Sequence, residues 1–278
     1  MRWRGRQEST NVEDRRGRTG RVVGGTIGIG TILFYLAYTL LTGEAPNEML
    51  QQTQQQTQQS QVVNDSLADF TKVIFKDTED VWSKLFPEQL QMRYRYPKLV
   101  LYSGRTDAAC GMASAAMGPF YCPADEKVYI DLQFFRDLKR KFGTTGDFAM
   151  AYIVAHEVGH HVQKQLGITE QMQRQRRRLS KTAYNKLSVR LELQADYLAG
   201  VWAHHIQKMK HVLDEGDIEE AIRAANSVGD DRLQKKQMGY VVPDAFTHGT
   251  SEQRMRWFIK GFKSGKILEG NTFQATNL

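Results

Sequence analysis

Residues 156–160 read His-Glu-Val-Gly-His, an H-E-x-x-H pattern with clear chemical potential. On a helix, side chains four positions apart share one face, so His156 and His160 can bind the same metal ion. Glu157 is turned by about 100° from His156 around the helix axis. It is therefore better placed to take a proton from an activated water molecule than to act as a ligand. The pattern predicts a metal centre with a general base beside it.

The neighbourhood of this pattern is apolar. Between Phe148 and Val162, the strongly polar side chains are those of residues 156, 157, 160 and 161. A helix that is apolar almost all round is a buried helix, and unpaired polar groups are costly to bury. A divalent metal would satisfy these side chains. The alternative is an internal helix whose histidines bond to backbone carbonyl groups.

A zinc site of the catalytic kind needs a third protein ligand and an open position for water. The best candidate is Glu192, which borders the apolar stripe of a second predicted helix together with Asp196, one turn further on. We expect Glu192 to bind the metal and Asp196 to accept a proton from a ligand imidazole. Two solvated carboxylates on a helix shoulder are the alternative.

The remaining histidines are weaker candidates as ligands. His161 points to a different face from His160, so we expect a supporting or structural role. His204, His205 and His211 fall where a helix turns polar, which predicts surface positions.

Attack of water on a carbonyl group also requires a hydrogen-bond donor that stabilises the negative charge developing on the carbonyl oxygen. His248 is the first choice and Tyr240 the second. Thr250 and Gln253 fit a capping box, which places His248 just before a helix. Loop packing is the alternative role for His248.

The elements that must position these residues can be predicted from periodicity and composition. Helical spacing of apolar residues predicts a first helix over 67–85, and two β-rich runs cover Lys98–Tyr102 and Lys127–Leu132. From Asp147 onward the pattern indicates helices joined by short loops. The prediction is an α+β fold, mostly helical with a small sheet. The run at 127–132 is either an edge strand that holds an extended substrate or a plain core strand.

The N-terminal region divides into three segments. Residues 1–21 hold seven arginines and three acidic residues, which gives +4 of the total net charge of +7 and predicts a basic, disordered, cytoplasmic tail. Residues 22–42 carry no charge and could span a bilayer as one helix. Residues 43–63 are rich in glutamine and indicate a linker or stalk, so the globular domain covers 64–278.

This arrangement predicts a single-span membrane protein. Arginines precede the apolar segment, and no Lys or Arg follows it until Lys72. The positive-inside rule then puts the N-terminus in the cytoplasm and the domain outside it, in the periplasm or the extracellular space. A cleaved signal peptide is the alternative, although the apolar run is longer than usual for one.

The net charge of the chain argues against a nucleic-acid-binding protein. Only +3 of the net charge remains for the chain beyond residue 21, which is too little for a nucleic-acid binder.

The two cysteines, Cys110 and Cys122, do not form a C-x-x-C pair, and in an oxidising compartment we expect a disulfide between them. Two unrelated buried thiols are the alternative.

The basic run 174–181 predicts a solvated helix face. The alternative is a surface that binds acidic substrates or lipid headgroups.

Several segments together resemble a known family. H-E-x-x-H followed by E-x-x-A-D resembles the glutamate-liganded zincins (gluzincins). The segments HEVGHHVQ (156–163), CGMASAAMGPFYCPAD (110–125), LELQADYLAG (191–200) and FTHGTSEQR (246–254) are similar to the bacterial neutral zinc metallopeptidase family. The resemblance implies a membrane-anchored, zincin-like domain with one zinc ion on His156, His160 and Glu192, and Glu157 as base.

The function expected from these observations is that of a zinc-dependent endopeptidase acting on peptides or proteins. Zinc would activate water, Glu157 would take its proton and later pass it to the leaving amine. The competing hypothesis is a scaffold or binding protein at the membrane that keeps zinc for structure only. An intact Glu157 argues against it, since a structural zinc site has no use for a base.

Overall fold

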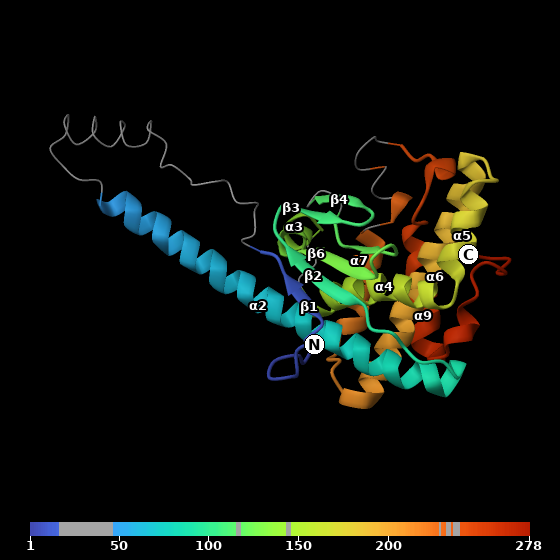
Figure 1. Ribbon diagram of the computed structural model, residues 1–278, viewed down its shortest axis with the longest axis horizontal. Helices are drawn as coiled ribbons and strands as arrows, with labels where there is room; N and C mark the ends of the chain where they lie inside the picture. The colour runs from blue at the N-terminus through green and yellow to red at the C-terminus, as the bar shows by residue number, and fades with distance from the viewer. Residues whose placement is uncertain (17–46, 115–117, 143–145, 228, 232–234, 236–239) are drawn as a thin grey trace.

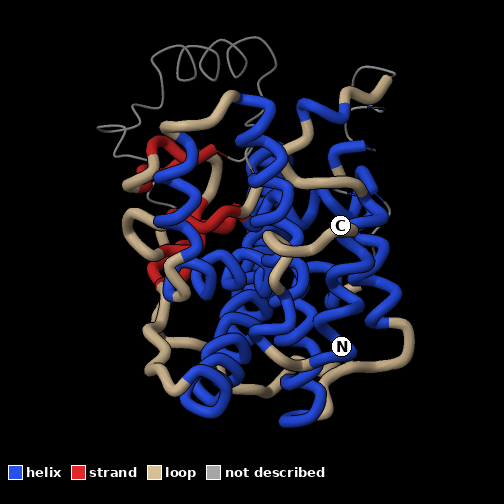
Figure 2. The backbone as a smooth tube through the Cα atoms, turned by 90° about the vertical axis from the view of Figure 1, so that its right-hand side faces the viewer, coloured by secondary structure: helices blue, strands red, loops and turns tan. Residues whose placement is uncertain are grey.

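The computed structural model describes residues 1–16, 47–114, 118–142, 146–227, 229–231, 235 and 240–278. A small sheet lies to one side of a mostly helical body (Figure 2). The expected α+β class, mostly helical, is confirmed. The predicted membrane span at 22–42 lies outside the described residues. Within the described ranges, no helix combines the length and the apolar character that a bilayer crossing requires.

The first helix, α2, covers Asn47–Leu85 and so begins well before the predicted start at residue 67. The glutamine-rich segment continues this helix because glutamine is a good helix former and no Gly or Pro interrupts it. Figure 1 shows the N-terminal half of α2 projecting away from the body, while its C-terminal half packs into it. A five-residue π-helical turn, Phe86–Leu90, follows directly.

Four strands form the main sheet, in the order β1-β2-β6-β5. They are β1 (Val12–Asp14), β2 (Lys98–Tyr102), β6 (Lys127–Asp131) and β5 (Phe120–Cys122). β1, β2 and β6 run parallel, and β5 pairs antiparallel with β6. Both predicted strands are present. However, β6 lies between β2 and β5, so the edge-strand interpretation of residues 127–132 is wrong, and β1 and β5 are the edges of this sheet in the described chain.

Two further strands, β3 (Arg105–Ala108) and β4 (Gly111–Ser114), form a separate antiparallel hairpin. The expected disulfide is confirmed: it joins Cys110, at the turn of this hairpin, to Cys122 at the end of β5. The bridge therefore ties the hairpin to the edge of the main sheet.

The prediction of helices from residue 147 onward is confirmed. They are α4 (Asp147–Gln165), α5 (Ile168–Arg176), α6 (Lys181–Lys210), α7 (Asp217–Ser227) and α9 (Ser251–Ser264). A helix that was not predicted, α3 (Leu132–Phe142), follows β6. Short 3₁₀ turns lie at Pro243–Ala245 and Ile267–Gly270. The core forms where α4 and α6 pack on each other and on α2, α7 and α9.

Glycines allow α6 to approach its neighbours closely. A β-carbon at Gly159 of α4 would lie 3.1 Å from the carbonyl oxygen of Ala195, and one at Gly200 would lie 2.1 Å from the carbonyl oxygen of Phe258 in α9. The first contact brings the H-E-x-x-H helix against the segment that carries residues 192 and 196. The second brings α9 against the other side of α6. These approaches position the site described next.

Residues 1–16 are ordered, so the prediction of a disordered tail is wrong for these residues. Residues 12–14 form β1 in the sheet, and Met1 and Trp3 bond to the helical body. Their partners lie tens to hundreds of residues away in the chain, which local composition could not reveal.

Candidate metal centre

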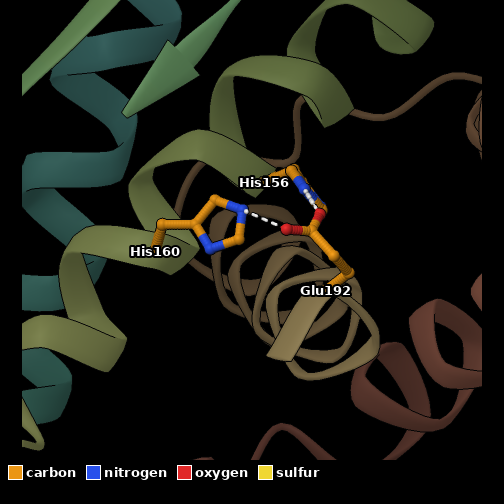
Figure 3. A group of neighbouring side chains, drawn as sticks. All are labelled: His156, His160 and Glu192. Atoms are coloured by element: carbon orange, nitrogen blue, oxygen red, sulfur yellow. Dashed lines mark hydrogen bonds and ion pairs between the residues drawn. The ribbon is translucent and has the colours of Figure 1, made fainter. Parts of the chain in front are cut away.

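His156, His160 and Glu192 lie together in the structure (Figure 3). One possible ligand atom from each lies within 4.8 Å of the others. Nε2 of His156 is 3.2 Å from Oε2 of Glu192, and Nε2 of His160 is 3.6 Å from Oε1. Two ligands on tetrahedral zinc, each about 2.0–2.1 Å from the ion, lie roughly 3.4 Å apart. The three side chains therefore fit the donor set of a zinc ion.

The charges at the site also favour a cation. Burial raises the pKa of Glu192, but His160 and His156 outweigh it and hold that pKa well below its usual range. Burial lowers the pKa of His160, and Glu192 more than reverses this and raises it. The cluster thus attracts positive charge to the space between its ligand atoms. A divalent metal would supply that charge and displace the protons.

Asp196 fixes the ring of His156. Its Oδ1 lies 2.8 Å from Nδ1 of His156, which directs Nε2 of the same ring toward Glu192. Asp196 is fully buried, and it also accepts hydrogen bonds from Tyr152 and Arg254. The structure therefore places Asp196 where the sequence predicted a residue that orients a ligand imidazole.

Gln163 does the same for His160, and the sequence analysis did not anticipate it. The Nε2 amide group of Gln163 donates to the carbonyl oxygen of Leu191 at 2.7 Å and to Oε1 of Gln194 at 3.1 Å. Its Oε1 is therefore the atom that faces Nδ1 of His160, at 2.8 Å. Both imidazoles are held through Nδ1, which leaves both Nε2 atoms for the metal. The spacing of residues 160 and 163, one turn apart, was the available signal.

Glu157 lies in the same cleft as the three ligand candidates but is not one of the clustered donors. The side chain is buried, and burial is the dominant cause that raises its pKa. The backbone N–H of Tyr121, in the edge strand β5, acts in the opposite direction and lowers the pKa of Glu157. The geometry fits a carboxylate that exchanges a proton beside the metal position.

The cleft has a volume of about 490 Å³. The edge strand and the turn before it supply one wall, through Pro119, Phe120 and Tyr121, and Phe134 and Ile153 add apolar surface. Among the strands that the structure describes, β5 pairs with β6 alone, on one side. Its other side can therefore pair with an extended chain.

His248 also lines the cleft, whereas the exposed Tyr240 is not among the lining residues of the described chain. Nδ1 of His248 lies 3.2 Å from Oδ1 of Asp230, and Oδ2 of Asp230 accepts the backbone N–H of His248 at 2.6 Å. The hydrogen bond with Asp230 raises the pKa of His248. Since Asp230 holds the Nδ1 side, Nε2 is the nitrogen available to a ligand. The predicted capping box at Thr250 and Gln253 is present.

The other histidines take structural positions. His161 contacts the hydroxyl group of Tyr121 through Nδ1 at 2.9 Å and the carbonyl oxygen of Arg95 through Nε2 at 2.7 Å, and burial lowers its pKa to about 4. His204 and His205 are half-buried and bond to carbonyl groups near the end of α9, so their assignment to the surface was only partly right. His211 is exposed at the end of α6.

The basic run covers the end of α5, the turn after it and the first residue of α6, and its members are exposed. None of them lines the cleft among the described residues. The members are Arg174, Arg176, Arg177, Arg178 and Lys181.

Besides Gln163, two further buried residues of the site were missed in the sequence. Arg254, on α9, donates to Asp196 and is 5% exposed, and Asp230 is 8% exposed. Arg254 is one of many arginines in the chain, and only the fold distinguishes it.

The site as a whole is of the kind that metallopeptidases use. It combines two histidines from one helix with a glutamate from a second helix, and Glu157 lies beside them.

The comparisons with known proteins agree with this class. The model of the family described as "Putative neutral zinc metallopeptidase" matches residues 1–273. The chain belongs to this family. It is 48% identical over 286 residues to "Uncharacterized protein YpfJ" of Escherichia coli (strain K12), covering 98% of this chain and 99% of that protein.

More distant relatives occur in mycobacteria. The chain is 40% identical over 208 residues to "Uncharacterized protein Mb2605" of Mycobacterium bovis and to "Uncharacterized protein Rv2575" of Mycobacterium tuberculosis (strain H37Rv). The match covers 71% of this chain and 68% of each relative. No solved structure matches the chain.

Proposed function

We propose that this protein is a zinc-dependent endopeptidase that hydrolyses extended segments of peptides or proteins. The observation that carries the proposal is the convergence of His156, His160 and Glu192 in a cleft that also holds Glu157 and borders an open strand edge. A zinc ion bound by the three side chains would act as a Lewis acid toward water and a carbonyl oxygen.

Residues of the chain would bind the substrate, transfer the proton and stabilise the oxyanion. The open edge of β5 binds the backbone of the substrate as an added strand. Glu157 takes a proton from the attacking water and delivers it to the leaving amine, and its raised pKa suits both steps. His248, with its Nδ1 side held by Asp230, donates a hydrogen bond to the developing oxyanion from Nε2.

The disulfide supports a location for the domain outside a reducing compartment. Disulfides persist in the periplasm and outside the cell and are rare in the cytosol. We therefore place the domain in the periplasm or the extracellular space, with residues 22–42 as its membrane attachment.

A scaffold that uses zinc only for structure is the competing function. A structural zinc site is closed by four protein ligands, whereas the described residues bring three donors together in the lining of a cleft. A buried carboxylate beside the metal position, such as that of Glu157, would also have no role in a scaffold.

The direct test is cleavage of an unstructured protein such as casein by the purified full chain. We expect cleavage that a chelator abolishes and that added zinc restores. Cleavage that persists after complete removal of metal would refute a zinc-dependent mechanism. Zinc binding without any cleavage of unstructured proteins would favour the scaffold.

A further inference from the structure

The first sixteen residues form an ordered part of the domain. Their terminal amino group, an aromatic side chain and a short strand each contact a different element of the domain. Figure 1 shows β1 beside β2. These contacts bear directly on the topology that the sequence predicts.

The domain binds the α-amino group of Met1. This group lies 3.1 Å from Oδ2 of Asp214, which precedes α7, and 3.1 Å from Oδ1 of Asp217, the first residue of α7. Asp217 is 4% exposed. The backbone N–H of Arg2 donates to the carbonyl oxygen of Val212 at 2.8 Å. Asp214 and Asp217 together thus hold residue 1 of the segment against the domain.

Trp3 connects this segment to the metal-binding helix. Its indole Nε1 donates to Oδ2 of Asp147 at 2.8 Å, and Asp147 is the first residue of α4. The indole ring also packs edge-on against Phe70 of α2, with the ring centroids 5.4 Å apart. A tryptophan with its N–H bonded and its ring packed is a strong anchor.

The rest of the segment pairs with buried groups of the domain. Ser9 and Asn11 both donate to Oε1 of Glu79, which is 5% exposed, at 2.7 and 2.8 Å. Residues 12–14 then pair with β2 in parallel, and Lys127 of β6 contacts Glu13 at 2.7 Å. Lys127 and Arg15 hold the pKa of Glu13 at about 2. Backbone pairing, buried polar bonds and ion pairs thus all favour the bound segment.

We propose that the domain contains a built binding site for residues 1–16, and that these residues therefore lie on the same side of the membrane as the metal centre. A single crossing by residues 22–42 would place these two parts on opposite sides, where the contacts could not form. The bound N-terminus and a cytoplasmic tail with an external domain are mutually exclusive. The contacts favour the bound state.

Cysteine labelling of the full chain tests the proposal. One variant carries Gln7→Cys in the N-terminal segment, and another carries Gln173→Cys on α5; both positions are exposed. Intact cells are treated with a membrane-impermeant maleimide, before and after permeabilisation, without reductant. The wild-type chain measures the background from Cys110 and Cys122. We expect both variants to react in intact cells, or both only after permeabilisation. Reaction of one in intact cells and of the other only after permeabilisation would overturn the proposal.

A second measurement tests the binding itself. Trp3→Ala removes the anchor, whereas Gln7→Ala changes an exposed side chain of the same segment. We expect Trp3→Ala to lower the melting temperature of the full chain by roughly 5 °C, and Gln7→Ala to leave it unchanged. Equal melting temperatures for both variants would show that the segment does not hold to the domain. Neither residue belongs to the metal centre, so this test is independent of peptidase activity.

Discussion

Nε of Arg254 donates a hydrogen bond to Oδ2 of Asp196 at 2.9 Å, next to His156 of the candidate metal centre. A second hydrogen bond joins Nη2 of Arg254 to Oδ1 of Asp196 at 3.0 Å. The same Oδ1 faces Nδ1 of His156. The guanidinium group thus compensates a buried carboxylate whose task is to orient a ligand. A chain of contacts runs from α9 through α6 to the metal position on α4.

Loss of this ion pair should harm both stability and metal binding. Arg254→Met keeps much of the side-chain volume and leaves Asp196 buried without its partner charge. Removal of one partner of a buried pair costs about 3–5 kcal/mol, so the free energy of unfolding in denaturant should fall by that order. The matched control is Arg256→Met, at an exposed position on the same helix. Equal unfolding curves for the two variants would contradict this role of Arg254.

Gln163 should matter for zinc affinity and little for folding. Gln163→Ala removes the acceptor that holds Nδ1 of His160, and loss of such a partner weakens metal binding by roughly 10–100-fold. Competition with a chromogenic chelator measures the change, and Gln171→Ala, on the exposed face of α5, is the control. A zinc affinity equal to that of the wild type would show that His160 needs no such support.

The pair of Asp230 and His248 should control the alkaline limb of the pH–activity profile. Asp230 faces Nδ1 of His248, so Nε2 carries a proton only in the charged ring, and Asp230 raises the pKa of that ring. Activity should therefore persist above the usual histidine pKa of 6.5 and fall as pH rises through the raised value. Asp230→Asn lowers the pKa of His248, so the decline should start at lower pH, while rates below pH 6 change least. A profile of unchanged shape would remove His248 from the reaction.

Close helix packing should make Gly200 sensitive to the smallest side chain. Gly200→Ala puts a methyl group 2.1 Å from a backbone oxygen of α9, whereas the nearest atom at Gly159 is 3.1 Å away. Overpacking of this kind costs about 1–3 kcal/mol. We expect a marked fall in melting temperature for Gly200→Ala and a smaller one for Gly159→Ala. The reverse order would contradict the packing of α6 against α9.

The local features of the site could be predicted from the sequence. The apolar stretch 148–162 indicated a buried helix, and the structure shows one with His156 and Glu157 buried within it. Glu192 and Asp196 could be picked out because they border an apolar stripe one turn apart. The capping box before α9 depends on residues three positions apart. Each of these patterns lies within one helix.

Features that depend on distant pairing could not be predicted. The residue that supports Asp196 is 58 positions away, and the partners of Met1 are more than 200 positions away. Residues 1–16 were predicted to be disordered from their basic composition, because the strand, the helices and the buried groups that they contact lie far away in the chain. The order of strands in the sheet likewise has no local signal, so β6 was taken as a possible edge although β1 and β5 are the edges in the described chain.

The central claim is that Glu157 is the base of a zinc peptidase and not a ligand, and Glu157→Gln tests it most directly. Zinc content and cleavage of casein are measured on the same preparations of wild type and variant. We predict that the variant keeps about one zinc ion per chain, held by His156, His160 and Glu192, while its rate of cleavage falls by roughly 10²–10⁴. A variant that loses its zinc, or that keeps its zinc and cleaves at the rate of the wild type, would contradict the account.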